Sequence, residues 1–270
     1  MASARWIERA VLAALVASGL ASPAGPARFY VALAVGFVGI AGVVLSGAAL
    51  VTWIAERSEE RLQGPRRLAR FAWRGARDTL GAALVAACFL AWPLSSLWAG
   101  HSTGLVWTLE EAGGLVPVVL GNLLGILALD AWLYWKHRLL HTRWLFRFHR
   151  AHHGYKDPTS FSSFAVGTVE SVLTFWPIVL LSFPWAPHYA PVYFGLVAGF
   201  IGLNLYLHCG VASRLAEATL PRVGLNTSAF HNRHHADASI NFGEALIVWD
   251  HLMGTGERAT RDRLSPGGSR

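Results

Sequence analysis

The chain has 270 residues, of which 53% are hydrophobic and only 14% are charged, and its mean hydropathy is +0.38. Soluble domains usually carry about 25% charged residues, so this composition argues against a soluble protein and predicts an integral membrane protein. The net charge of +7 does not by itself indicate nucleic-acid binding, because basic residues facing an anionic membrane surface account for it. The two cysteines, Cys88 and Cys209, lie in apolar stretches and give no disulfide framework.

Long apolar stretches divide the chain into candidate membrane spans. The candidates are residues 29–55, 79–100, 112–135, 165–184 and 188–209. Residues 171–213 lack charged residues throughout, and the sequence PWAP at 184–187 predicts the turn that divides them into two spans. An earlier apolar stretch, residues 10–22, predicts a short uncleaved span or an interfacial helix, because Glu8 disturbs the basic start of a signal peptide.

The positive charges predict how these spans are oriented. Most lysines and arginines lie in three segments, residues 56–78, 136–156 and 214–270. The connections at 101–113 and 184–190 contain none. The positive-inside rule therefore places the three basic segments in the cytoplasm, with successive spans running in opposite directions. Although this rule counts no histidine, it predicts that the histidines at 137–153 and 231–235 lie together on the cytoplasmic side. It predicts that His101 and His188 lie on the other side.

The first cluster contains His137, His141, His149, His152 and His153, and the second contains His231, His234 and His235. Residues i, i+3 and i+4 share one face of a helix, so each H-x-x-H-H segment is expected to point two or three imidazoles in one direction. Neutral imidazole is a good ligand for iron, zinc and copper. A solvated, pH-responsive histidine face does not explain the repeated spacing, so the sequence predicts metal binding.

His208 ends the last apolar span and is a candidate ninth ligand, with an interfacial histidine as the alternative. Nine imidazoles exceed what one tetrahedral zinc uses and suit two metals with four or five protein ligands each. Soluble di-iron sites in helical bundles draw on Glu and Glu-x-x-His, whereas these clusters contain no carboxylate. The predicted centre is therefore dominated by histidine.

Polar residues near the clusters are candidates to orient the ligands. Asp130, Tyr134, His137 and His141 form an i, i+4, i+7, i+11 line on one helical face. Ligand histidines normally donate their second N–H to a carboxylate or carbonyl, so we expect Asp130 to accept that bond, unless an arginine pairs with it. Asn204 precedes His208 by four residues and is either a polar group beside the metal or a packed, hydrogen-bonded amide. Asn241 and Asp250 complete these candidates.

With these motifs in view, the sequence resembles the fatty acid hydroxylase/sterol desaturase superfamily of membrane di-iron oxygenases over roughly residues 118–256. The resemblance rests on D-x3-Y-x2-HR-x2-H at 130–141, LFRFHRAHH at 145–153, HNRHH at 231–235, NFG at 241–243 and WDHLMGT at 249–255. It implies that the eight clustered histidines, with His208, hold two iron ions (Fe2+/Fe3+), and that O2 is a co-substrate. It also implies an external electron donor, either a b-type cytochrome, a ferredoxin or a reductase.

Two departures from the family pattern concern the regions around the clusters. Many members carry an RFHP-x-E-like segment after the second motif, whereas this chain reads AVGTVE at 165–170 and keeps only Glu170. The D-x-NFG element reads Ser239-Ile240-Asn241 and lacks its acidic residue. The histidine motifs themselves are intact, so these departures bear on substrate contacts or the shape of the cap.

The expected fold is an all-α transmembrane bundle with a four-span core, one or two additional N-terminal hydrophobic segments and a cytoplasmic helical cap. The expected divisions are residues 1–110, membrane segments with a basic loop; 111–256, the catalytic domain; and 257–270, a polar disordered tail. The expected activity is O2-dependent hydroxylation, which we favour over desaturation, of a lipid, sterol or fatty acyl chain. A histidine-rich metal transporter and a b-type haem electron carrier are the alternatives, whereas a zinc hydrolase of the HExxH type is excluded by the missing motif.

Overall fold

The computed structural model describes residues 2–62 and 68–257, and these are almost entirely helical, as the sequence predicts. The long helices are α1 (Ala2–Ser18), α2 (Pro26–Ala55), α3 (Leu68–Trp98), α4 (Leu115–Leu140) and α7 (Ala190–Leu207). The intermediate helices are α5 (Phe146–His149), α6 (Thr168–Phe175), α8 (Arg214–Thr219), α9 (Ser228–Ala236) and α10 (Val248–Met253). Short 3-10 segments are η1 (Gly19–Ala21), η2 (His152–Gly154), η3 (Ser160–Ser162), η4 (Trp176–Ser182) and η5 (Leu220–Val223).

Four of the described helices are long and apolar enough to cross a membrane, namely α2, α3, α4 and α7. The chain is therefore an integral membrane protein with the four-span core that its sequence predicts. Side chains of Trp53, Trp98 and Trp185 are more than half exposed near span ends, where tryptophan anchors a helix at the membrane interface.

The predicted span at 165–184 differs from a regular membrane helix. It forms α6 and then continues as the 3-10 segment η4, with Pro177 in the first turn of η4. Proline has no N–H to continue the helix and clashes with the carbonyl four residues earlier, which is that of Leu173. The Leu173 carbonyl instead accepts a hydrogen bond from the indole Nε1 of Trp132 on α4, at 2.7 Å. Helices α4 and α6 are therefore tied together next to the histidine end of α4.

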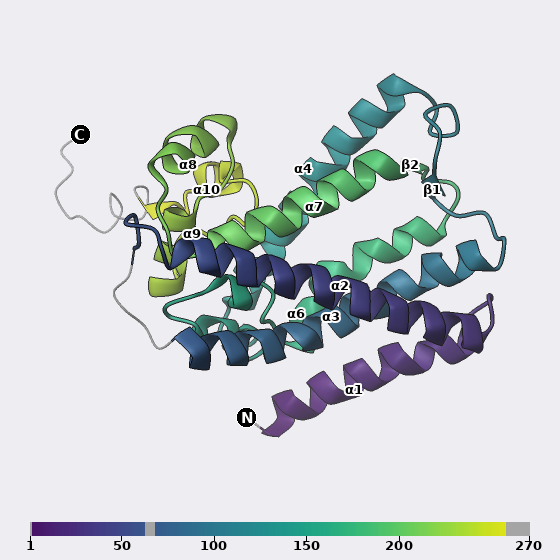
Figure 1. Ribbon diagram of the computed structural model, residues 1–270, viewed down its shortest axis with the longest axis horizontal. Coiled ribbons are helices and arrows are strands. Elements are labelled where there is room, and N and C mark those ends of the chain that lie inside the picture. The colour runs from purple at the N-terminus through teal and green to yellow at the C-terminus, as the bar shows by residue number, and fades with distance from the viewer. Residues whose placement is uncertain (1, 63–67, 258–270) are drawn as a thin grey trace.

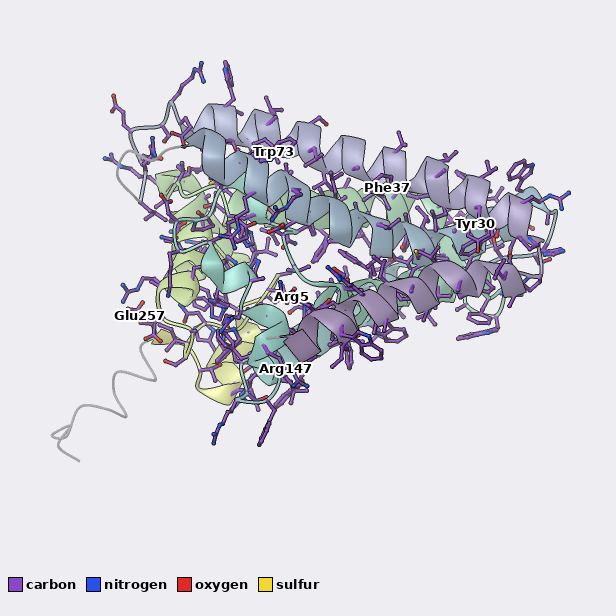
Figure 2. The ribbon with its side chains drawn as sticks, turned by 90° about the horizontal axis from the view of Figure 1, so that it is seen from below. Arg5, Tyr30, Phe37, Trp73, Arg147 and Glu257 are labelled. Carbon is purple, nitrogen blue, oxygen red and sulfur yellow. The ribbon has the colours of Figure 1, made fainter. Side chains whose placement is uncertain are left out.

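The helices alternate in direction, and the small elements α8, α9 and α10 gather at the end where α2, α4 and α7 terminate (Figure 1). Figure 2 shows Arg5 of α1 and Arg147 of α5 there, and Tyr30 of α2 at the opposite end. We call the assembly of α5, η2, α8, α9 and α10 the cap.

The opposite end of the bundle is closed by a small parallel sheet. Strand β1 (Leu105–Val106) pairs with β2 (His188–Tyr189), with Leu105 opposite His188. The predicted turn at 184–187 lies between η4 and β2. His188 is therefore far from the cap, as the charge pattern predicts, and His101 precedes β1 at the same end (Figure 1). The predicted disordered tail falls almost entirely on residues outside the described part of the chain.

Candidate metal centre

The nine candidate histidines come together as two adjacent groups, each with its ligand nitrogens within 4.8 Å of one another. The first group is His137, His141, His149, His153 and His234. The second group is His152, His208, His231 and His235. Eight of the nine residues are buried and His141 is half-buried. The numbers five and four agree with the predicted four or five ligands for each of two metals.

Four separate parts of the fold supply these side chains. The last turn of α4 carries His137, and His141 is the residue at which that helix ends. His208 occupies the equivalent place at the end of α7. The segment from α5 to η2 and the helix α9 carry the two H-x-x-H-H sequences. The ends of two apolar helices and two cap segments therefore converge at the boundary between the bundle and the cap.

Each H-x-x-H-H segment divides its histidines between the two groups, and two of the three in each segment share a group, within the expected two or three. The Nε2 atoms of His149 and His153 lie 3.1 Å apart in the first group, whereas His152 belongs to the second. In the α9 segment the i, i+4 pair lies in the second group, and His234 crosses to the first. The i, i+4 relation therefore holds in both segments, but the intervening i+3 histidine turns away.

Three of the rings have their protonation fixed by a backbone carbonyl. Nδ1 of His137 donates to Phe242 O at 2.9 Å, and Nδ1 of His234 donates to Ile240 O at 2.7 Å. Nδ1 of His208 donates to Asn204 O at 2.9 Å. A carbonyl can only accept, so the proton of each neutral ring lies on Nδ1 and leaves an Nε2 lone pair. These lone pairs are directed at the centre of their groups.

Burial keeps these rings neutral. Desolvation lowers the pKa of His208 to about 4 and that of His234 to about 3. Burial, together with repulsion from neighbouring imidazoles, lowers the pKa values of His152, His231 and His235 well below their usual range. A neutral imidazole is the form that binds a metal. These five rings are therefore neutral at pH 7, which is the form that can bind a metal.

A cation between two lone pairs accounts for a distance that a hydrogen bond does not explain. Nε2 of His137 lies 3.1 Å from Nε2 of His149, although both rings donate from Nδ1, to Phe242 O and to Glu170. Two unprotonated nitrogens at such distances repel each other. A metal–imidazole bond of about 2.1 Å places neighbouring ligand nitrogens about 3.0 Å apart at right angles. The first group therefore fits a metal ion with several imidazole ligands.

Glu170, and not Asp130, is the carboxylate that accepts a hydrogen bond from a ligand histidine. Oε2 of Glu170 on α6 lies 2.7 Å from Nδ1 of His149, and both side chains are buried. The prediction for Asp130 is wrong. Its carboxylate instead accepts from the backbone N–H groups of Ala245 and Leu246, at 3.1 and 3.2 Å, and from the indole of Trp249, at 2.8 Å. The family resemblance had singled out Glu170 as a retained residue, but its role was not predicted.

The loop at 240–243 is an acceptor for two ligand histidines, because its carbonyls at Ile240 and Phe242 bind His234 and His137. Asn241 between them adopts a left-handed conformation with φ +58°, which asparagine tolerates better than most residues. Its amide Nδ2 donates to Phe230 O on α9, and its Oδ1 accepts from Glu257 N. Asn241 therefore contributes through the loop and not through direct contact with a ligand ring.

Asp250 on α10 holds the other side of this loop. Its carboxylate accepts from Phe242 N at 2.9 Å and Gly243 N at 2.7 Å, and also from the Thr255 hydroxyl. A Cβ at Gly243 would lie 2.5 Å from Leu246 O, so only glycine fits. The phenol of Tyr134 lies 2.9 Å from the Thr255 hydroxyl. Tyr134 and Asp250 thus support the loop whose Phe242 carbonyl orients His137. They were predicted to orient the ligands, and they do so through this loop and not by contacting a ligand ring.

Asn204 contacts the candidate ligand His208 through its backbone carbonyl. Its carbonyl accepts from His208, whereas its side-chain Nδ2 donates to Phe200 O at 3.0 Å. This matches the packed, hydrogen-bonded alternative. Within the described chain, the remaining histidines stay apart from the two groups. His188 contacts Ala186 O, and His251 contacts Ile247 O.

A narrow cavity of about 40 Å³ touches ligands of both groups. The histidines that line it are His137 and His149 of the first group and His152, His208 and His231 of the second. Its apolar wall consists of Phe164, Val166, Phe175, Phe200 and Leu207, and its polar wall of Lys136, Ser163, Glu170, Thr174, Asn204 and Glu244. Nζ of Lys136 forms an ion pair with Oε1 of Glu244 at 2.7 Å. The cavity is thus a mainly apolar space that reaches both candidate metal sites from the bundle side.

Comparison with known proteins shows that this chain is similar to a family of hydroxylases and to enzymes that act on sterols and lipids. Residues 122–255 match the family described as "Fatty acid hydroxylase". The chain is 31% identical to human lathosterol oxidase over 146 residues, which is 53% of this chain and 46% of that protein. It is 32% identical to an ornithine lipid hydroxylase of Rhizobium tropici over 148 residues, 52% of this chain and 42% of the relative.

A Delta(7)-sterol 5(6)-desaturase of Gibberella zeae is 29% identical over 149 residues, 55% of this chain and 41% of the relative. The chain thus spans less than half the length of these curated relatives. No solved structure matches it. The matched residues include all nine histidines of the two groups and Glu170.

Proposed function

We propose, from the match of residues 122–255 to the fatty acid hydroxylase family, that this chain is a membrane-bound non-haem di-iron oxygenase that acts on a lipid. The observation that carries the proposal is the convergence of nine imidazoles into adjacent groups of five and four. Their inward lone pairs suit two metal ions, and their position at the ends of membrane helices suits a substrate dissolved in the bilayer.

Two iron ions held by the five and the four histidines would supply the activation of O2 and the oxidising power for an unactivated C–H bond. Hydroxylation requires R–H, O2, two electrons and two protons, and it yields R–OH and water. Desaturation with the same inputs removes two hydrogens from adjacent carbons and yields an alkene and two waters. We favour hydroxylation, since it needs only one C–H bond to face the centre.

The protein contributes binding, orientation and the exclusion of water. The apolar wall of the cavity, including Phe175 and Phe200, is suited to contact a methylene group of a lipid beside His137 and His208. Glu170 and the loop at 240–243 fix the ligand rings. The two-electron supply has to come from a partner, and a b-type cytochrome, a ferredoxin or a reductase fits that requirement.

We also propose that the cap faces the cytoplasm. The basic residues of the segments 56–62, 136–156 and 214–257 gather at the cap end, whereas the β1–β2 end of the described chain carries few. The positive-inside rule then orients the cap toward the cytoplasm, where a soluble electron donor has access. The lipid would reach the cavity from within the bilayer.

The alternatives fit the site less well. A haem carrier uses two axial histidines, whereas here five nitrogens converge in one group and four in the next. A transporter needs polar or ionisable residues along the interior of its spans. Helix α2 carries only Arg28, at its first turn, and α7 carries no charged residue.

The first test is the metal content and iron spectrum of detergent-purified protein, by elemental analysis and Mössbauer spectroscopy after growth on iron-57. About two spin-coupled irons per chain are expected. One metal or none after iron-replete growth, or a haem spectrum, would contradict the di-iron proposal. Two zinc ions would call for reconstitution with iron before the same measurement. Mass spectrometry of host lipids then separates hydroxylation, a gain of one oxygen, from desaturation, a loss of two hydrogens.

A further inference from the structure

We propose that Glu8 of helix α1 is a positioning residue for the first histidine group, acting through helix α6 and Glu170. The proposal rests on metal binding by that group. It concerns a part of the chain that lies outside residues 122–255, and it assigns a role to the acidic residue Glu8 of α1.

Glu8 supplies the N-terminal cap of α6 from a helix far away in the sequence. Its Oε2 accepts from the backbone N–H of Val169 at 2.9 Å, and the N–H and hydroxyl of Thr168 also contact the carboxylate. The first N–H groups of a helix have no partner inside it, and they carry partial positive charge. The residue at the usual capping position, Gly167, has no side chain to serve them. A carboxylate from α1 takes that place.

Gly167 leaves room for this contact. A Cβ at residue 167 would lie 2.7 Å from Oε1 and 3.3 Å from Oε2 of Glu8. The backbone at Gly167, with φ −72° and ψ 169°, is one that any residue adopts. Glycine is therefore needed there for the approach of the Glu8 carboxylate and not for the backbone conformation. Helices α1 and α6 pack against each other over this region.

The capped turn of α6 contains the carboxylate that orients a ligand. Glu170 follows Val169 directly, is 3% exposed and accepts from Nδ1 of His149 at 2.7 Å. The position of the first turn of α6 therefore sets the position of the Glu170 carboxylate, which in turn sets the orientation and basicity of His149. Glu8 is thus three contacts away from the metal site and touches no ligand itself.

A double-mutant cycle on metal affinity tests this chain of contacts. The measurement is the iron retained per chain against graded chelator concentrations, in protein reconstituted into phospholipid nanodiscs. Groups that hold ligand histidines typically contribute about 10- to 100-fold to metal affinity, so we expect that loss for Glu170→Ala. For Glu8→Ala we expect about a 3- to 10-fold loss. The double variant should match Glu170→Ala alone, because Glu8 acts only through Glu170.

Three further variants separate positioning from a general effect on stability. Glu8→Gln keeps an acceptor oxygen and should recover most of the affinity. Gly167→Ala should reproduce the loss of Glu8→Ala by displacing its carboxylate, and it should add nothing in the Glu8→Ala background. The exposed neighbour Arg9→Ala serves as the matched control and should retain the wild-type affinity. The Mössbauer quadrupole splitting of one iron should change in Glu8→Ala, since one ligand ring is reoriented.

Unchanged affinity and spectrum in Glu8→Ala would overturn the proposal, and so would losses that multiply in the double variant. Wild-type protein that binds no metal would instead contradict the di-iron function. The two failures are therefore distinguishable in the same set of measurements.

Discussion

Nδ1 of His149 lies 2.7 Å from Oε2 of Glu170, and this pair joins the cap to the membrane bundle. His149 ends α5 in the cap, whereas Glu170 lies in α6, which packs against α3. Both side chains are buried, so the hydrogen bond forms in a low dielectric, where its loss leaves two unsatisfied polar groups. The pair therefore orients a ligand ring and also fixes the cap on the bundle.

Substitution of Glu170 should weaken metal binding more than it weakens lipid binding. We expect about a 10- to 100-fold loss of metal affinity for Glu170→Ala and a smaller loss for Glu170→Gln, which keeps an acceptor oxygen. Chelator competition on purified protein checks both values. Glu110→Ala, at an exposed acidic residue near the opposite end, is the control. Equal affinities of Glu170→Ala and wild type would contradict the role of this carboxylate.

Substitution within either histidine group should remove metal and activity together. His152→Ala in the second group and His234→Ala in the first should abolish lipid oxidation and lower the iron content per chain. His101→Ala and His188→Ala, at the β1–β2 end, should change neither. Elemental analysis and lipid mass spectrometry of the four variants provide the comparison. Loss of activity in all four with metal retained would count against the assignment.

Asp250 should contribute to stability through the loop that receives His137. Asp250→Ala leaves the buried N–H groups of Phe242 and Gly243 without their acceptor, which costs about 1–3 kcal/mol for each group. Thermal unfolding in detergent should therefore show a clear decrease in midpoint temperature, accompanied by partial loss of iron. Glu59→Ala, at an exposed glutamate, should leave the midpoint nearly unchanged. A midpoint equal to that of wild type would show that the loop holds its shape without Asp250.

Filling the cavity should separate metal binding from lipid oxidation. Val166→Phe adds bulk to a cavity of about 40 Å³ without touching a candidate ligand. We expect two irons per chain and a loss of at least about tenfold in lipid oxidation, because a displacement of the reacting carbon by about 1 Å already costs about 100-fold. Val223→Phe, at an exposed site in the cap, is the control. Full activity in Val166→Phe would place the substrate elsewhere.

The convergence of the clustered histidines could be predicted from the sequence, because a metal site is expected to impose a repeated spacing on one residue type. The membrane spans could be predicted as well, since an apolar run of sufficient length is a local property. Both depend on residues that are neighbours along the chain. His208 needed the further observation that its span ends on the same side as the clusters.

The assignment of His152 to the second group could not be predicted, because α5 ends at His149 and the helical periodicity stops there. His234 lies within the regular helix α9, and its assignment to the first group depends on how α9 packs on the other ligand segments. Asp130 lies on the same helical face as His137, but its carboxylate is turned to the N–H groups of Ala245 and Leu246, which are distant in sequence. Such pairings are decided by tertiary packing, and helical periodicity contains no information about them.

The division of the H-x-x-H-H segments determines what sets the spacing of the two centres. His152 and His153 are neighbours in sequence, yet one belongs to each group. Consecutive Cα atoms are held about 3.8 Å apart by covalent geometry. One peptide unit therefore links the two groups in each of two cap segments, which limits how far apart the cap histidines of the two groups can lie. A movement of α4 or α7 that admitted a lipid would shift His137, His141 or His208 against these cap histidines.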